Sequence, residues 1–180
     1  MTAARIILEQ KGYDAATTNN VAELAGVSIG SLYQYFAGKE AIFAALVEDT
    51  IIKAGDRTRD LLIECMHMPL TAAIHAIVRH MVDIRREYGF VLRQLPREMP
   101  RFHTITGHLT VEKYLVNATS AFYAAHREEI RVNNLSSAGF VVQHLLINTI
   151  DSFLDNTNLE MSEDVLVHQL CDAAIKYLTK

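Results

Sequence analysis

Apolar side chains recur at helical spacing along most of this chain, and no segment shows the strict alternation of a half-buried strand. Apolar positions three and four residues apart form one face of an α-helix. Only eight glycines and three prolines interrupt the 180 residues, which favours long helices over a turn-rich β fold. We therefore predict an all-α protein.

Polar and glycine-containing breaks divide the N-terminal part of this pattern into four helices. The first helix ends near Gly12, because glycine accepts the left-handed backbone of a helix C-terminus. Thr17 and Ser28 are residue types that cap helix N-termini, so we expect a helix to begin after each of them. Gly26 ends the helix between the two caps, and Lys39 opens a long helix that runs to about residue 66. Beyond it we predict helices over 70–88, 89–96, 102–127, 137–156 and 163–178.

Composition excludes several classes of protein. No run of about eighteen uncharged apolar residues is present, so we expect no membrane span. The N-terminus lacks a basic segment followed by an apolar secretory core, and Cys65 and Cys171 are isolated thiols without metal-type spacing. These features predict a cytoplasmic protein. Its net charge of −4 argues against a general polyanion binder.

The segment VAELAGVSIGSLYQYF, residues 21–36, contains two short helical stretches joined by a turn at Gly-Val-Ser. This pattern predicts a helix-turn-helix, the motif that lays its second helix in the major groove of DNA. Helical spacing predicts four side chains that face the core, Leu24, Val27, Leu32 and Phe36. The outward face of the second helix then consists of small, hydroxyl and amide side chains.

Such a face suits close contact with a duplex. Small residues at the leading end of the helix allow close approach, and Gln34 can pair with adenine through two hydrogen bonds. Tyr33 and Tyr35 carry hydroxyls that reach phosphate oxygens, and the helix N-termini above Thr17 and at Lys39 offer N–H groups to phosphates. The alternative is an ordinary helical hairpin whose tyrosines and serines are merely exposed.

The segment TTNNVAELAGVSIGSLYQYFAGKEAIFAAL, residues 17–46, resembles the DNA-binding region of TetR-family transcriptional repressors. The resemblance rests on the AGVS turn, the GSLYxYF helix and the Lys-Glu pair that opens the fourth helix. It departs from the family pattern at Ala37-Gly38 and at Asn20. The resemblance implies a homodimer with a helix-turn-helix DNA-binding domain over 1–46 and a helical effector-binding and dimerisation domain over 47–180. The implied DNA contacts, with Ile29 added from the helical face, are Thr17, Ser28, Ile29, Gly30, Ser31, Tyr33, Gln34, Tyr35 and Lys39.

The charge of this region is unusual for a DNA-binding domain. Residues 1–48 hold three basic side chains against five acidic ones, whereas a DNA-binding surface is normally basic. Either helix dipoles and neutral donors make most of the phosphate contacts, or a basic arm precedes the first helix. Both explanations predict a shallow dependence of binding on salt for this chain.

Polar residues on otherwise apolar helices are candidates for the wall of an effector pocket. For each of them, a structural or surface role is the alternative. The arginine-rich segment 79–101 is either a solvated surface, a hinge near the DNA-binding domain, or a site for an anionic effector. The candidate pocket residues are His75, Arg79, Phe102, His103, Thr106, Thr110, Tyr114, Phe122, His144 and Asn148.

The segment 137–156 is apolar on more than one face, so it must be buried on more than one face. Together with the last helix it predicts a hairpin that pairs with a second copy in a four-helix bundle about a two-fold axis. A hairpin packed only on its own core is the alternative. The candidate interface residues are Val141, Val142, Leu145, Leu146, Ile150, Phe153, Leu166, Leu170, Ala173 and Tyr177.

Other chemistry has little support in the sequence. The histidine pairs are five residues apart, which places their rings on different helix faces, so we expect no metal. No nucleophile motif, phosphate loop or pair of carboxylates with acid–base spacing is present, and we expect neither a cofactor nor an enzyme. The predicted function is a dimeric repressor that binds a palindromic operator and is released by a small-molecule effector. The rivals are a helical binding protein or adaptor without sequence-specific DNA binding, and an all-α enzyme using His75, His103 or His144.

Overall fold

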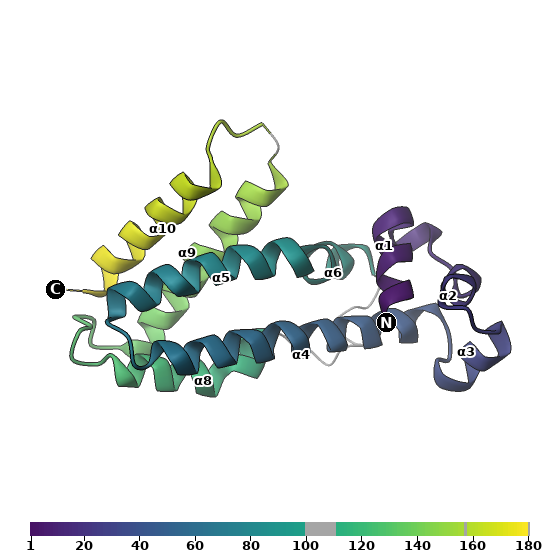
Figure 1. The fold of residues 1–180 in the computed structure, drawn as a ribbon, viewed down its shortest axis with the longest axis horizontal. Helices are drawn as coiled ribbons and strands as arrows, with labels where there is room; N and C mark the ends of the chain where they lie inside the picture. The colour runs from purple at the N-terminus through teal and green to yellow at the C-terminus, as the bar shows by residue number, and fades with distance from the viewer. Residues whose placement is uncertain (100–110, 157, 180) are drawn as a thin grey trace. The chain divides into compact units, whose positions relative to one another are not determined.

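The computed structural model describes residues 1–99, 111–156 and 158–179. Within these residues every regular secondary-structure element is a helix (Figure 1). The all-α prediction is confirmed. Outside the helices, Ile130 and Thr179 form one isolated antiparallel bridge. None of the described helices is long and apolar enough to cross a bilayer.

The chain divides into two compact units. The N-terminal unit comprises Met1–Ala54 and Tyr88–Val111, and the C-terminal unit comprises Gly55–Glu87 and Glu112–Lys180. The expected DNA-binding domain, residues 1–46, lies inside the first unit. That unit also takes in a segment from much later in the sequence, which packs against the first helix.

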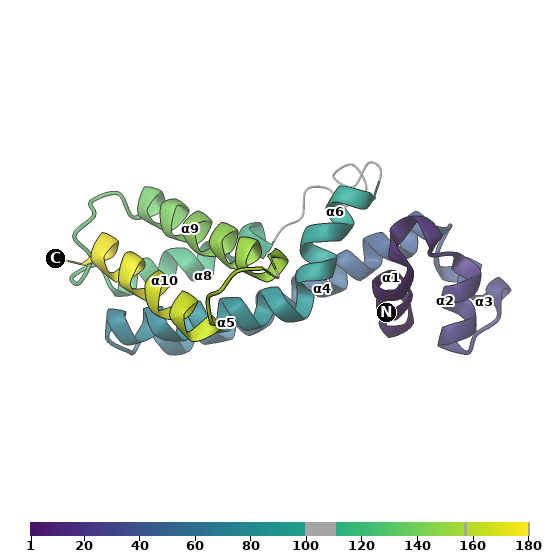
Figure 2. The same cartoon turned by 90° about the horizontal axis from the view of Figure 1, so that it is seen from above.

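The N-terminal unit is built around α1 (Thr2–Ala15), α2 (Thr18–Ala25), α3 (Ile29–Tyr35) and the first half of α4 (Lys39–Cys65). A π-helical turn, η1 (Phe90–Gln94), leads into the short α6 (Leu95–Glu98), which lies beside α1 (Figures 1 and 2). The core of this unit consists of Ala4, Ile7, Leu8, Tyr13, Ala16, Val21, Ile42, Phe43, Leu46, Val47, Ile51, Val91, Leu95 and Met99.

The C-terminal unit contains the second half of α4 with α5 (Leu70–Gly89), α8 (Val111–Ala125), α9 (Leu135–Asp155) and α10 (Glu163–Leu178). Its core draws side chains from all five helices, among them Leu62, Val78, Phe122, Leu146 and Leu170. Gly139 allows α9 to approach α8 closely, because a Cβ there would lie 3.0 Å from Cε2 of Tyr123.

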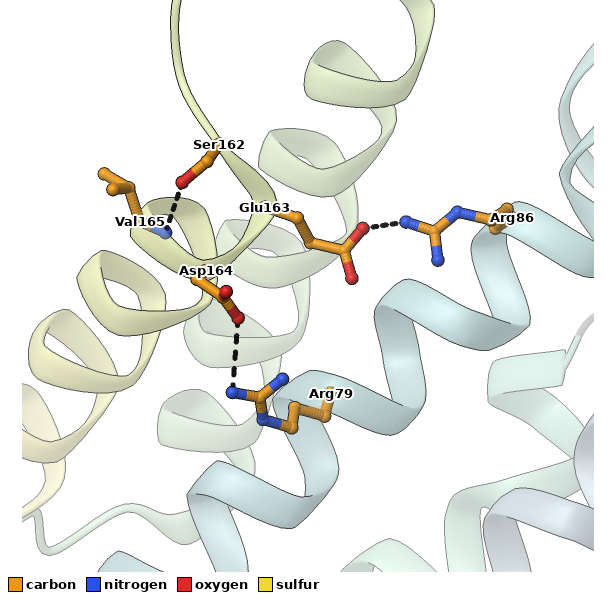
Figure 3. Close-up of polar contacts among 6 residues, drawn as sticks. All are labelled: Arg79, Arg86, Ser162, Glu163, Asp164 and Val165. Carbon is orange, nitrogen blue, oxygen red and sulfur yellow. Dashed lines mark hydrogen bonds and ion pairs between the residues drawn. The ribbon is translucent and has the colours of Figure 1, made fainter.

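Ion pairs join the start of α10 to α5 (Figure 3). Asp164 accepts a hydrogen bond from Arg79 at 3.4 Å, and Glu163 pairs with Arg86. Ser162 caps the same helix by accepting the backbone N–H of Val165. Between α5 and α9, Arg85 donates from Nε to Asp151 at 2.7 Å, and both side chains are largely buried.

The observed helix bounds agree with most predicted ones. The helices expected over 70–88, 137–156 and 163–178 are found over 70–89, 135–155 and 163–178. The segment 89–96 is a π-helical turn followed by a short α-helix. Of the helix expected over 102–127, the part over 111–125 is present, and 100–110 lie outside the described residues.

Candidate nucleic-acid interface

The interface predicted over residues 17–39 is built on two capped helices and a glycine turn. Thr17 Oγ1 accepts the backbone N–H of Asn20 at 3.2 Å and starts α2. Gly26 adopts a left-handed conformation with φ 68°, and the N–H of Val27 returns to the carbonyl of Ala22 at 3.0 Å. This pairing closes the C-terminus of α2 and turns the chain sharply into α3.

The helix α3 begins at a second side-chain cap. Ser28 Oγ accepts the backbone N–H of Ser31 at 3.0 Å, and the two serine hydroxyls lie 2.8 Å apart. Helix N-termini leave N–H groups without intrahelical partners, and these groups attract anions. The leading end of α3 is therefore held by a side-chain cap and carries no basic side chain.

Leu32 and Phe36 attach α3 to the core of the N-terminal unit, as their four-residue spacing predicted. No residue of α3 is fully buried. The remaining side chains form an exposed face, on which Tyr33 is 53 % and Tyr35 is 80 % exposed. The exposed residues of this face are Ile29, Gly30, Ser31, Tyr33, Gln34 and Tyr35.

The prediction that Leu24 and Val27 face the core is wrong, because they are 48 % and 45 % exposed. The two-turn helix α2 buries Val21 and Ala22. At about 100° per residue, Leu24 lies about 200° around the helix from Ala22, so its side chain points away from the side on which Ala22 is buried. Val27 contributes its backbone N–H to the turn rather than its side chain to the core.

Three contacts near this face have no counterpart in the sequence analysis. The hydroxyls of Thr18 and Tyr33 lie 3.2 Å apart and link α2 to α3. Lys39 donates from Nζ to the carbonyl of Asp14 at 3.2 Å, and its ammonium lies 4.1 Å from the centroid of the Tyr13 ring. These contacts join residues 15, 25 and 26 positions apart, which local sequence patterns do not reveal.

The candidate pocket residues do not gather around one site within the described residues. His75, Arg79, His144 and Asn148 are exposed, and Arg79 is paired with Asp164. Phe122 lies in the core of the C-terminal unit, where its ring contacts His126. The remaining candidates, Phe102, His103, Thr106, Thr110 and the side chain of Tyr114, lie outside the described residues.

Among the candidate interface residues on α9 and α10, five are used to fold the protomer. Val142, Leu146, Ile150, Leu166 and Leu170 are buried in its core. At these five positions a role in the dimer interface stays a prediction.

The other candidate interface residues lie at or near the surface. Val141, Leu145 and Ala173 are exposed, whereas Phe153 and Tyr177 are half-buried against the core. Phe140, which was not among the candidates, is 64 % exposed and contacts the ring of His144. No group of three potential metal ligands occurs among the described residues.

Comparison with known proteins places these features in context. Residues 1–46 match the family described as "Bacterial regulatory proteins, tetR family". No curated protein is similar enough in sequence to count as a relative.

Several solved structures share the fold. A protein from Mesorhizobium loti, described as a TetR-family transcriptional regulator, has a TM-score of 0.78 and 17 % identity over 97 % of this chain and 90 % of its own. FadR from Bacillus subtilis, in complex with stearoyl-CoA, has a TM-score of 0.77 and 15 % identity over 98 % and 96 %. The fatty acid degradation regulator FadR from Bacillus halodurans has a TM-score of 0.75 and 16 % identity over 97 % and 91 %. The chain therefore has a TetR-like fold.

Proposed function

We propose that this chain, which carries the N-terminal region of the tetR family of bacterial regulatory proteins on a TetR-like fold, is a dimeric transcriptional repressor released from its operator by a small molecule. The observation that carries the proposal is the exposed face of α3. The helix packs on the core of its unit through Leu32 and Phe36, and its other side chains leave an outward surface rich in hydroxyl and amide groups. The N-terminal region and the face together support a helix that reads the major groove.

Each group on this face has a role that its chemistry supports. The amide of Gln34 can give and accept hydrogen bonds with adenine, and the small residues Gly30 and Ser31 permit close approach to the bases. The exposed hydroxyl of Tyr35 and the ammonium of Lys39 suit phosphate oxygens, which fix the register of the protein on the duplex. Thr17 and Ser28 order the N-termini whose N–H groups face phosphate.

Dimerisation through α9 and α10 is supported by apolar side chains that the protomer leaves exposed. Val141 and Leu145 lie four residues apart on one side of α9, Phe140 is the exposed neighbour of Val141, and Val165 on α10 is 48 % exposed. Large apolar side chains that stay exposed close to one another mark an interaction surface. Two half-sites one helical turn apart require about 34–36 Å between the two copies of α3.

Substitution of the exposed α9 residues tests the dimer. Val141→Glu with Leu145→Glu is expected to convert the protein to a folded monomer in native mass spectrometry, because charges at a packed interface are left without partners. Ile63→Glu, at a 49 % exposed apolar residue of α4, is the matched control and is expected to remain dimeric. A dimer that survives the double substitution would exclude this surface.

A small-molecule effector in the helical domain completes the proposal, with the cytoplasm as its place of action. An effector can release DNA only by as much as it prefers the DNA-free conformation. Stearoyl-CoA is the first probe to test, since one protein of the same fold was solved in complex with it. Its binding should raise the Tm of this protein and release the protein from its DNA duplex.

Selection of duplexes from a random pool by the purified protein tests DNA binding itself. We expect enrichment of a palindrome with two half-sites one helical turn apart. The double variant Tyr33→Ala/Lys39→Ala should enrich nothing, whereas Lys176→Ala, at a surface ion pair of α10, should enrich the same sequence as the wild type. A wild-type pool without any enriched sequence would exclude an operator-binding repressor.

The excess of acidic over basic side chains in residues 1–48 favours a second candidate. In this alternative the protein is a helical small-molecule-binding dimer or adaptor without sequence-specific DNA binding. It predicts that the duplex selection fails while a ligand still raises the Tm.

A further inference from the structure

The helix α1 is interrupted at Gly12, and the break creates a binding position for a distant carboxylate. Gly12 has φ 70° and ψ 172°, which lies outside the helical region. Residues that restart a helix after such a break have N–H groups without intrahelical partners. The N–H of Tyr13 donates to Oε2 of Glu98 on α6 at 3.1 Å, although the two residues are 85 positions apart.

The two residues after the break hold the ammonium of Lys39. The carbonyl of Asp14 accepts from Lys39 Nζ at 3.2 Å, and the ring of Tyr13 lies beneath the same ammonium at 4.1 Å. The Tyr13 ring is itself fixed, because it is buried and packs edge-on against Phe43 at 5.6 Å between centroids. A cation over an aromatic face is attracted by the ring quadrupole.

These contacts run in sequence from α6 to the start of α4. Glu98 holds the backbone at Tyr13, Tyr13 and Asp14 hold the ammonium, and the ammonium belongs to the residue that opens α4. All four residues lie within the N-terminal unit. A lysine has a long flexible side chain, so groups that fix its ammonium reduce the conformational freedom that it loses on binding an anion.

We propose that Glu98 is a positioning residue for DNA binding: its carboxylate orders the Tyr13–Asp14 segment and thereby holds the ammonium of Lys39 ready for a phosphate. This inference rests on the proposed function, because it assigns Lys39 to a phosphate of the operator. It also predicts the direction in which DNA affinity changes when Glu98 is removed. A carboxylate that acted only by its charge would repel DNA, and its removal would tighten binding. A positioning residue has the opposite effect, and its removal weakens binding.

The first part of the test needs no DNA. Acetylation of lysines by acetic anhydride, followed by mass spectrometry, compares wild type with Glu98→Ala and Glu98→Gln. We expect Lys39 to react severalfold faster in Glu98→Ala, and less so in Glu98→Gln, which keeps an oxygen acceptor for the Tyr13 N–H. Lys53 and Lys176 are in surface ion pairs elsewhere and serve as internal standards of unchanged rate. An unchanged Lys39 rate in Glu98→Ala would overturn the proposal.

The second part is a double-mutant cycle on the duplex that the wild-type protein selects. Glu98→Ala should weaken binding by about three- to tenfold in the wild-type background and leave it unchanged in the Lys39→Ala background, as coupled groups in one contact network do. Equal losses in both backgrounds, or tighter binding by Glu98→Ala, would overturn the proposal. If the wild type selects no duplex, the proposed function fails, and the acetylation rates still decide whether Glu98 holds Lys39.

Discussion

Ser28 and Ser31 are paired at the start of α3, with their hydroxyls 2.8 Å apart and the N–H of Ser31 donating to Ser28 Oγ at 3.0 Å. The hydroxyl of Ser28 is thus engaged in capping the helix. We infer that Ser28 contributes to DNA binding chiefly by ordering the leading end of α3. Ser31, in contrast, is the serine that we expect to contact DNA directly.

Replacement of the cap should therefore destabilise the protein. Ser28→Ala is expected to lower the free energy of unfolding by about 1 kcal/mol, the usual effect of losing a side-chain N-cap. Ser28→Asn should restore most of that loss, because asparagine also caps. Urea unfolding measures both, with the exposed Ser136→Ala in α9 as a control that should stay at the wild-type value. A Ser28→Ala protein as stable as the wild type would show that the cap is dispensable.

The salt dependence of DNA binding should be shallow. Lys39 is the predicted phosphate contact with a charged side chain, and the others are neutral hydroxyls or backbone N–H groups, which release few counterions. Fluorescence anisotropy over a series of salt concentrations gives the slope of log K against log salt. A slope near about −8 or steeper would contradict this prediction, because it requires many phosphates to be neutralised by cations.

The ion pairs of α5 should differ in importance according to their burial. Arg85→Ala is expected to destabilise the protein by about 3 kcal/mol, because it leaves a largely buried carboxylate at Asp151 without this guanidinium. Arg79→Ala removes an exposed ion pair with Asp164 and should lower the free energy of unfolding by no more than about 0.5 kcal/mol. Chemical unfolding compares the two variants directly. Equal losses of unfolding free energy in the two variants would mean that burial does not decide how much each ion pair stabilises the protein.

Stability should fall steeply in alkaline solution because of Tyr123. Burial raises the pKa of this phenol to about 12, with a smaller contribution from Tyr177. Since the folded-state pKa lies above the unfolded value of about 10, the native protein holds the proton more tightly. The associated stability is present below pH 10 and is lost as pH rises through 12.

Tyr123→Phe should remove this dependence, which amounts to about 3 kcal/mol for a shift of two pKa units. Unfolding midpoints between pH 9 and pH 12 measure it, and the control is Tyr35→Phe, whose ring is exposed. If wild type and Tyr123→Phe lose stability in parallel, another group is responsible.

Local chemistry made parts of this structure predictable from sequence. The caps at Thr17 and Ser28 and the turn at Gly26 depend on residue types and their immediate neighbours, and all three are confirmed. The attachment of α3 through Leu32 and Phe36 followed from a single four-residue spacing. The helical content followed from the periodicity of apolar residues over long segments.

Features that depend on docking were not predictable in the same way. Leu24 is exposed because a two-turn helix can be rotated by its neighbours, and the spacing of apolar residues does not fix that rotation. Val142 and Leu146 lie on a helix with more than one apolar face, and the sequence does not say which face meets the protomer's own core. The contact between Glu98 and Tyr13 joins positions 85 apart and has no local signal.

The most direct test of the central claim, that α3 reads base edges in duplex DNA, is the affinity of Gln34→Ala for the selected duplex and for its single-base substitutions, measured by fluorescence anisotropy. We expect Gln34→Ala to lose about 1–3 kcal/mol of discrimination at one adenine. Tyr35→Phe should instead weaken binding uniformly across sequences, as loss of a phosphate contact does. A Gln34→Ala protein with the affinity and base preference of the wild type would contradict the account.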